Sequence, residues 1–142
     1  MATQPMDIHQ AIPHRPPMLL VDEVVQCDQD QIVCRKQFRA DEFFLQGHYP
    51  DRPIVPGVIL CEFALQAGAI LLSELVTPEG GVPVVTRMND VKFKRIVDPG
   101  ETAEATVSLH EQLSKAFFMK AKVTVDGQLA ARLDFACTMA PE

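Results

Sequence analysis

Two residues of types that transfer protons, His48 and Glu62, lie on either side of a predicted loop-to-helix junction. His48 lies in the segment 47–57, which contains three prolines and two glycines. Because proline fixes φ and drives the preceding residue out of the helical region, this segment is predicted to be a stiff loop. Glu62 belongs to the apolar stretch 58–72, which predicts a helix that is buried nearly all round and begins at Gly57.

This set of groups suits removal of a proton beside a carbonyl, with loss of a neighbouring hydroxyl. Burial favours the protonated form of a carboxyl, so Glu62 would be available as an acid near neutral pH. His48 on the rigid loop is the matching base, and backbone N–H groups near Gly57 can stabilise negative charge. Each residue also has an ordinary structural explanation, since a buried glutamate can be half of an ion pair and a loop histidine can be a satisfied core residue.

The spacing between Gly57 and Glu62 raises a geometric difficulty. The five residues that separate them correspond to about 7.5 Å along a helix axis. Helical side chains lean toward the N-terminus, which shortens this gap. Even so, the two groups of one chain would serve the carbonyl and hydroxyl of one substrate poorly unless the substrate lay along the helix. A second chain that supplies one of the groups would remove the difficulty.

The run GHYPDRPIVPGVILCEFALQ, residues 47–66, resembles the active-site signature of the 3-hydroxyacyl-(acyl carrier protein) dehydratases. These are hot-dog-fold enzymes of fatty acid synthesis. The segments IPHRPPMLLVD at 12–22 and VKFKRIVDPGE at 91–101 agree with the same family, so the resemblance covers roughly 8–139. A motif of this length with a fixed histidine-to-glutamate spacing is far more specific than a short pattern.

The resemblance assigns roles to three residues. His48 matches the family's catalytic histidine, Glu62 its catalytic carboxylate, and Gly57 the glycine whose N–H polarises the thioester carbonyl. A glutamate rather than an aspartate implies the branch that does not also isomerise the double bond. Family active sites lie at a dimer interface, with the histidine and the carboxylate from different protomers, which would answer the geometric difficulty.

The wider substrate site follows from the same comparison. Tyr49 stands where the family commonly has phenylalanine, and Phe63 and Leu65 stand where alanines are usual. These departures leave the chemistry intact and concern the length of acyl chain, which is expected to run in a tunnel along the helix. The residues predicted to bind substrate or the oxyanion are Gly57, Val58, Tyr49, Phe63, Leu65 and Gln66.

A dense basic cluster lies at Lys92, Lys94 and Arg95. It could contact the phosphopantetheine arm or an acidic carrier protein, or it could be a solvated strand face or a subunit contact. In a strand, the two lysines would lie on one side and Phe93 on the other. The pair His14–Arg15 is predicted instead to anchor the N-terminal segment to the core.

Composition restricts the class of protein. A chain of 142 residues with 47% hydrophobic residues predicts one domain, 1–142, with a real core. A net charge of −6 argues against nucleic-acid binding and against a basic membrane-binding patch. The N-terminus lacks a signal-like apolar region and no apolar run reaches transmembrane length, so a cytoplasmic location is expected. The four cysteines lack metal or disulfide spacing, and Cys61 is expected to be a small buried residue.

Turn signals at Pro99–Gly100 and Asp126–Gly127 separate extended segments in the second half of the chain. One long helix among five to six strands predicts an α+β fold, with an antiparallel sheet wrapped round the helix. That architecture matches the hot-dog fold independently of the motif. The expected extended segments are 18–25, 31–38, 82–89, 91–97, 103–111, 116–125 and 129–139. In the second of them, Ile32, Cys34, Lys36 and Phe38 are expected on one side.

The sequence thus predicts an enzyme that dehydrates (3R)-3-hydroxyacyl thioesters, carried on acyl carrier protein, to trans-2-enoyl thioesters. No metal or redox cofactor is expected, because the reaction needs only proton transfer and charge stabilisation. The expected assembly is a homodimer with shared sites, or a trimer of such dimers. Two alternatives remain: a hot-dog thioesterase in which Glu62 activates water, and a non-catalytic acyl-binding subunit.

Overall fold

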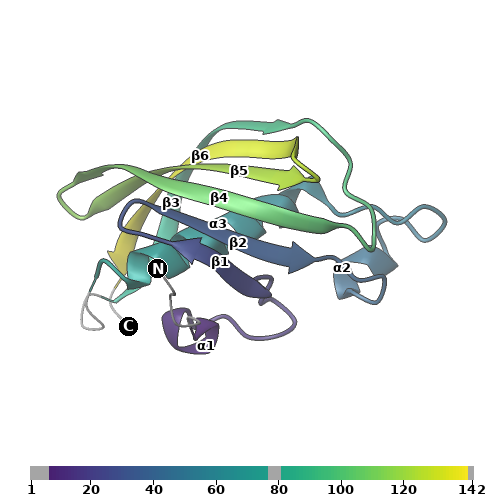
Figure 1. The fold of residues 1–142 in the computed structure, drawn as a ribbon, viewed down its shortest axis with the longest axis horizontal. Coiled ribbons are helices and arrows are strands. Elements are labelled where there is room, and N and C mark those ends of the chain that lie inside the picture. The colour runs from purple at the N-terminus through teal and green to yellow at the C-terminus, as the bar shows by residue number, and fades with distance from the viewer. Residues whose placement is uncertain (1–6, 77–80, 141–142) are drawn as a thin grey trace.

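A computed structural model describes residues 7–76 and 81–140. Six antiparallel strands in the order β1-β2-β4-β5-β6-β3 form one sheet, which curves across the long helix α3, Gly57–Ser73 (Figure 1). This is the hot-dog arrangement expected from the sequence. The other elements are β1 (Glu23–Cys27), β2 (Gln31–Gln37), β3 (Val82–Phe93), β4 (Thr102–Leu113), β5 (Ala116–Val125), β6 (Gln128–Ala140), α1 (Ile8–Ala11) and α2 (Phe43–Gln46).

Helix α3 begins and ends where local chemistry dictates. Pro56, with φ −58° and ψ 138°, is the last extended residue before the helix, and the predicted start at Gly57 is confirmed. Most side chains of α3 are buried, as its apolar composition predicts. An open stripe remains along Val58, Glu62 and Leu65, which are exposed or half-buried. No helix in the described ranges is long and apolar enough to cross a membrane.

The inner face of the sheet follows the two-residue alternation of its strands. Ile32, Cys34, Lys36 and Phe38 are all buried, which confirms the face predicted for this strand. Lys36 tolerates burial because its Nζ lies 2.7 Å from Glu42 Oε2, at the turn that leads into α2. The Asp126–Gly127 turn is also confirmed, since both residues have the positive φ that a tight hairpin turn requires.

Two strand predictions are wrong. The strand expected over 18–25 begins only at Glu23, because the backbone N–H of Leu20 bonds to the Gln66 side chain on α3 instead of to a neighbouring strand. The two segments expected over 82–89 and 91–97 form one strand, β3, which pairs with β6 throughout and absorbs a bulge near Asp90, where φ is +53°.

Strand β3 lies at an edge of the sheet and is unusually apolar for that position. Residues 84–93 are all exposed in the single chain. A long edge with this composition is a template for pairing with another chain. The exposed apolar residues on it are Val84, Val85, Met88, Val91 and Phe93.

Candidate active site

The loop that carries His48 fixes the tautomer of the imidazole. Nδ1 lies 3.1 Å from the carbonyl oxygen of Ile54, so Nδ1–H donates there and Nε2 keeps a free lone pair. The Ile54 N–H in turn donates to the His48 carbonyl at 2.9 Å, which closes the loop. The Tyr49 ring stacks on the imidazole, with centroids 4.4 Å apart, across a cis peptide bond. The loop therefore holds the imidazole in one orientation at the groove, with Nε2 left for a ligand.

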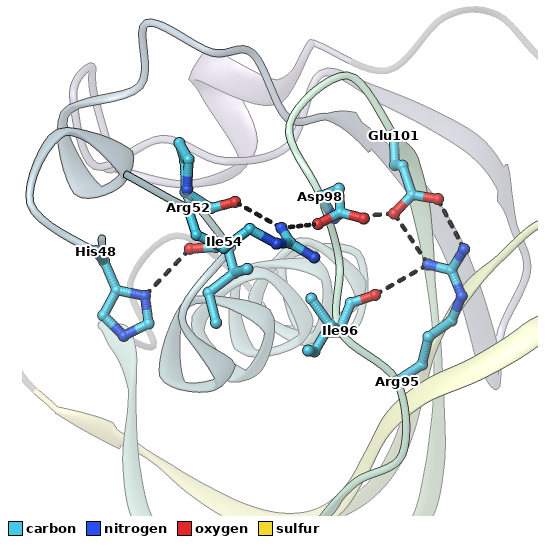
Figure 2. A network of polar contacts seen from close by, with 8 residues as sticks. His48, Arg52, Ile54, Arg95, Ile96, Asp98 and Glu101 are labelled. Atoms are coloured by element: carbon cyan, nitrogen blue, oxygen red, sulfur yellow. Dashed lines mark hydrogen bonds and ion pairs between the residues drawn. The ribbon is translucent and has the colours of Figure 1, made fainter. Parts of the chain in front are cut away.

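A network of polar contacts ties this loop to the turn that follows β3 (Figure 2). Arg52 bridges to Asp98 at 2.7 Å. Arg95 donates two hydrogen bonds, of 3.0 and 2.7 Å, to Glu101, and Glu101 also accepts the Asp98 N–H at 2.9 Å. The hydrogen bonds from Arg95 hold the pKa of Glu101 below its usual value. The His48 loop and the turn are thereby fixed as one unit.

A groove of about 530 Å³ opens between these segments and the start of α3. His48, Gly57, Val58 and Phe93 are among its lining residues. A Cβ on Gly57 would lie 2.8 Å from the Phe93 ring, closer than real contacts allow, so any larger residue here would have to displace the ring. Sequence analysis did not single out Phe93 as a site residue, although it noted its place between two lysines.

The first residues of α3 line the same groove. The N–H groups of Ile59 and Leu60 donate to the Pro56 carbonyl at 2.9 and 3.4 Å. The N–H groups of Gly57 and Val58, which line the groove, lie too early in the helix to have an acceptor one turn back. Together with the partial positive charge of a helix N-terminus, they form a place that can stabilise negative charge on a ligand.

The carboxyl group of Glu62 is held by a second network. Gln66, only 1% exposed, accepts the Leu20 N–H on Oε1 and donates through Nε2 to the Met18 carbonyl and to Glu62 Oε2, each at 2.8 Å. These backbone partners fix the orientation of the amide. Oε2 of Glu62 is therefore a hydrogen-bond acceptor, and Oε1 is the oxygen that can carry a proton to a ligand.

His48 and Glu62 of one chain do not share a groove. Glu62 is absent from the lining of the His48 groove, within the part of the chain that the structure describes. Five residues of helix turn the side-chain direction by about 140°, so Gly57 and Glu62 face different sides of α3.

Comparisons with known proteins identify the family. A family model described as ApeI-like, ApeI dehydratase, matches residues 24–132. A FabZ 3-hydroxyacyl-[acyl-carrier-protein] dehydratase from Clostridium perfringens is 39% identical over 124 residues, which covers 87% of this chain and 89% of the relative. One from Oenococcus oeni is 37% identical over 129 residues, 90% and 93% of the two chains. The chain belongs to the 3-hydroxyacyl-[acyl-carrier-protein] dehydratase family.

Solved structures agree on the fold of this dehydratase. The dehydratase heterocomplex ApeI:P from Xenorhabdus doucetiae matches with a TM-score of 0.82 at 15% identity, over 99% of this chain and 94% of that one. The uncharacterized protein PH1136 from Pyrococcus horikoshii gives a TM-score of 0.73 at 17% identity, over 99% and 97%. At such identities the likeness concerns the fold alone.

The remaining predicted site residues of the dehydratase fall into different environments. Val58 is 71% exposed at the groove, and Leu65 lies half-buried on the same open stripe as Glu62. Phe63 is fully buried, with its ring edge-on to Phe38 at 6.4 Å, so it packs in the core of the single chain. Its contact with substrate stays a prediction, as does that of Tyr49, which is 55% exposed beside the imidazole.

The three residues of the basic cluster, Lys92, Lys94 and Arg95, also lie in different environments. Lys92 and Lys94 are exposed, and Lys94 and Arg95 line the groove. Because β3 ends at Phe93, the expected strand alternation does not extend to Lys94, whose N–H bonds to the Ala130 carbonyl at 2.7 Å. The guanidinium of Arg95 is occupied by Glu101, which gives it a structural role.

Arg15 donates to the carbonyls of His9, Ile12 and His14, so its bonds hold the N-terminal segment together locally, and the predicted anchoring to the core by this pair stays a prediction. His14 itself lies beside the Glu62 carboxyl group, with Nε2 3.8 Å from Oε2. Sequence analysis missed this contact, since no local pattern connects residues so far apart in the chain. The prediction for Cys61 is confirmed, because this thiol is buried and burial raises its pKa.

Proposed function

We propose that this dehydratase converts (3R)-3-hydroxyacyl thioesters to trans-2-enoyl thioesters, with His48 as base and Glu62 as acid. The observation that carries the proposal is the position of the His48 imidazole. Its Nδ1 is held by the Ile54 carbonyl at 3.1 Å, and the ring lines the same groove as the first residues of α3. A base with this tautomer beside helix N–H groups suits proton removal next to a carbonyl.

The proposed steps balance without a further reactant. His48 Nε2 takes the C2 proton, and the negative charge that develops on the thioester oxygen is stabilised by the Gly57 N–H. The C3–O bond breaks as Glu62 Oε1 gives its proton to the leaving hydroxyl, so that water leaves and the C2–C3 double bond forms. Proton exchange with solvent restores both residues. We therefore expect no metal or redox cofactor.

The two halves of the site come together when a second copy of the chain is added. The open stripe of α3 carries Glu62 between Val58 and Leu65, and the apolar edge of β3 is exposed beside the groove. Pairing of two copies along this edge would cover it and bring Glu62 of one copy toward His48 of the other. We propose a homodimer with two shared sites, with a trimer of such dimers as a higher assembly.

The natural thioester is proposed to be carried on acyl carrier protein, as the names of the FabZ relatives state for those enzymes. Lys94 lines the groove, and Lys92 is exposed two residues earlier, so both supply positive charge for an acidic carrier. Arg95 supports the groove wall through Glu101, so it contributes less to docking than the lysines. A cytoplasmic role in fatty acid synthesis fits this carrier.

The test follows the ultraviolet absorbance of the conjugated enoyl thioester in the hydration direction. Wild type should remove the absorbance of crotonyl or longer enoyl thioesters, and His48→Ala and Glu62→Gln should each abolish the change. Exposed residues on β4 supply matched controls, His110→Ala and Glu111→Gln, which should behave as wild type. A folded wild-type protein inactive on every chain length and carrier would contradict the proposal.

The same samples distinguish the alternatives. Release of free thiol from a saturated acyl thioester, without any change in the enoyl band, would indicate a thioesterase that uses Glu62 to activate water. Acyl binding that survives both substitutions, with no turnover of either substrate, would indicate a non-catalytic acyl-binding subunit.

A further inference from the structure

Glu62 has a neighbour besides Gln66, and it comes from a different part of the chain. The imidazole of His14, in the segment between α1 and β1, places Nε2 3.8 Å from Glu62 Oε2. This separation is longer than a hydrogen bond. Contacts around catalytic groups are often long in the absence of ligand and tighten when substrate binds.

The other ring nitrogen of His14 indicates which tautomer is present. Nδ1 is buried and has no hydrogen-bond partner among the described residues. A buried N–H without an acceptor is rarer in proteins than an unsatisfied acceptor, so the hydrogen belongs on Nε2 and Nδ1 is bare. His14 therefore presents an Nε2–H donor to the carboxyl group.

The segment that holds His14 is well supported. Arg15 bonds to the carbonyls of His9, Ile12 and His14 itself, at 2.8, 2.9 and 2.7 Å. The carbonyl of Arg15 accepts the Met18 N–H at 2.9 Å. The backbone of His14 is thus fixed from both sides, which suits a residue that orients another side chain.

We propose that His14 is a positioning residue for Glu62 in the dehydratase reaction, a role that rests on the proposed function. Its Nε2–H and the Gln66 amide converge on Oε2, and this turns Oε1, which carries the transferable proton, toward the substrate hydroxyl.

Three substitutions separate this role from simple packing. His14→Gln keeps an amide donor near the position of Nε2, His14→Asn is too short to place one there, and His14→Phe fills the space without a donor. We expect kcat to fall about 10- to 100-fold in the Asn and Phe variants, because a small misplacement of a reacting group carries a cost of this size. The Gln variant should recover most of kcat. KM should change little in all three, because the proposed role of His14 acts through Glu62 and not through binding of substrate.

The enoyl hydration assay on the full-length protein gives the readout, with thermal melts of each variant and the exposed His9→Asn as control. Wild-type kcat in folded His14→Asn or His14→Phe would overturn the inference. Equal loss of kcat in all three variants in step with lost stability would also overturn it, because it would show a structural role. If His14→Phe does not fold, the Gln and Asn pair decides. Inactive wild type, in contrast, would refute the proposed function itself.

Discussion

The buried amide of Gln66 makes a sharp prediction, because Gln66→Glu changes almost no volume yet replaces a donor by an acceptor. Oε1 can still accept the Leu20 N–H. The second carboxylate oxygen, however, would face the Met18 carbonyl and Glu62 Oε2, where Nε2 now donates two bonds of 2.8 Å. The new carboxylate oxygen would then face two other acceptors without a hydrogen between them, at a position that is only 1% exposed.

The magnitude follows from those two contacts. Each buried polar group that loses its partner costs about 1–3 kcal/mol, so the free energy of unfolding should fall by about 2–6 kcal/mol at neutral pH. That is a large part of the ~5–15 kcal/mol that stabilises a typical domain. A protonated carboxyl at position 66 can restore one donor, so the difference from wild type should shrink as the pH is lowered.

Urea denaturation at one protein concentration, at pH 7 and at about pH 5, measures both effects. The control is Gln46→Glu, which makes the same change of charge at an exposed position of α2. A Gln66→Glu variant within about 1 kcal/mol of wild type at neutral pH would refute the orientation of the amide, and with it the assignment of Glu62 Oε2 as an acceptor.

Three further predictions test other parts of the molecule. Gly57→Ala should displace the Phe93 ring, which is 51% exposed and free to move. The rate of enoyl hydration should therefore fall at least about tenfold, with little loss of stability. Adding Phe93→Ala should recover part of that rate. Glu101→Gln should destabilise the protein at pH values above 4.5, the ordinary pKa of the carboxyl group. The loss of stability should shrink as the pH falls through the lowered pKa of Glu101, because protonation of wild-type Glu101 also removes its ion pair with Arg95. Denaturation measured over a range of pH checks this. Burial raises the pKa of Cys34 to about 12, so a thiol reagent at pH 8 should label it only after unfolding, as peptide mapping would show.

Local patterns account for the parts of the structure that the sequence predicted well. The proline-rich loop, the helix start at Gly57 and the Asp126–Gly127 turn depend on residues adjacent in the chain, whose φ preferences and apolar periodicity decide the conformation. The buried face of β2 was predicted for the same reason, including Lys36, although its partner Glu42 was not.

The features that were missed depend on partners distant in the chain. The segment 18–22 has strand-like residues, but the Gln66 side chain takes its Leu20 N–H and keeps it out of the sheet. In the same way, the contact between Phe93 and Gly57 and the approach of His14 to Glu62 arise only once the sheet closes on α3. Periodicity carries no information about such pairs.

A mixing experiment tests the central claim, that His48 and Glu62 act together across two copies of the chain. His48→Ala and Glu62→Gln variants with different tags are co-expressed or refolded together, and enoyl hydration is measured. With random pairing, half of the dimers contain one copy of each variant, and one of the two sites in such a mixed dimer has both native residues. About one quarter of wild-type activity should therefore return. As a control, wild type mixed with the double variant should form mixed dimers without an intact site. Two inactive variants whose mixed dimers form and yet remain inactive would contradict the shared site.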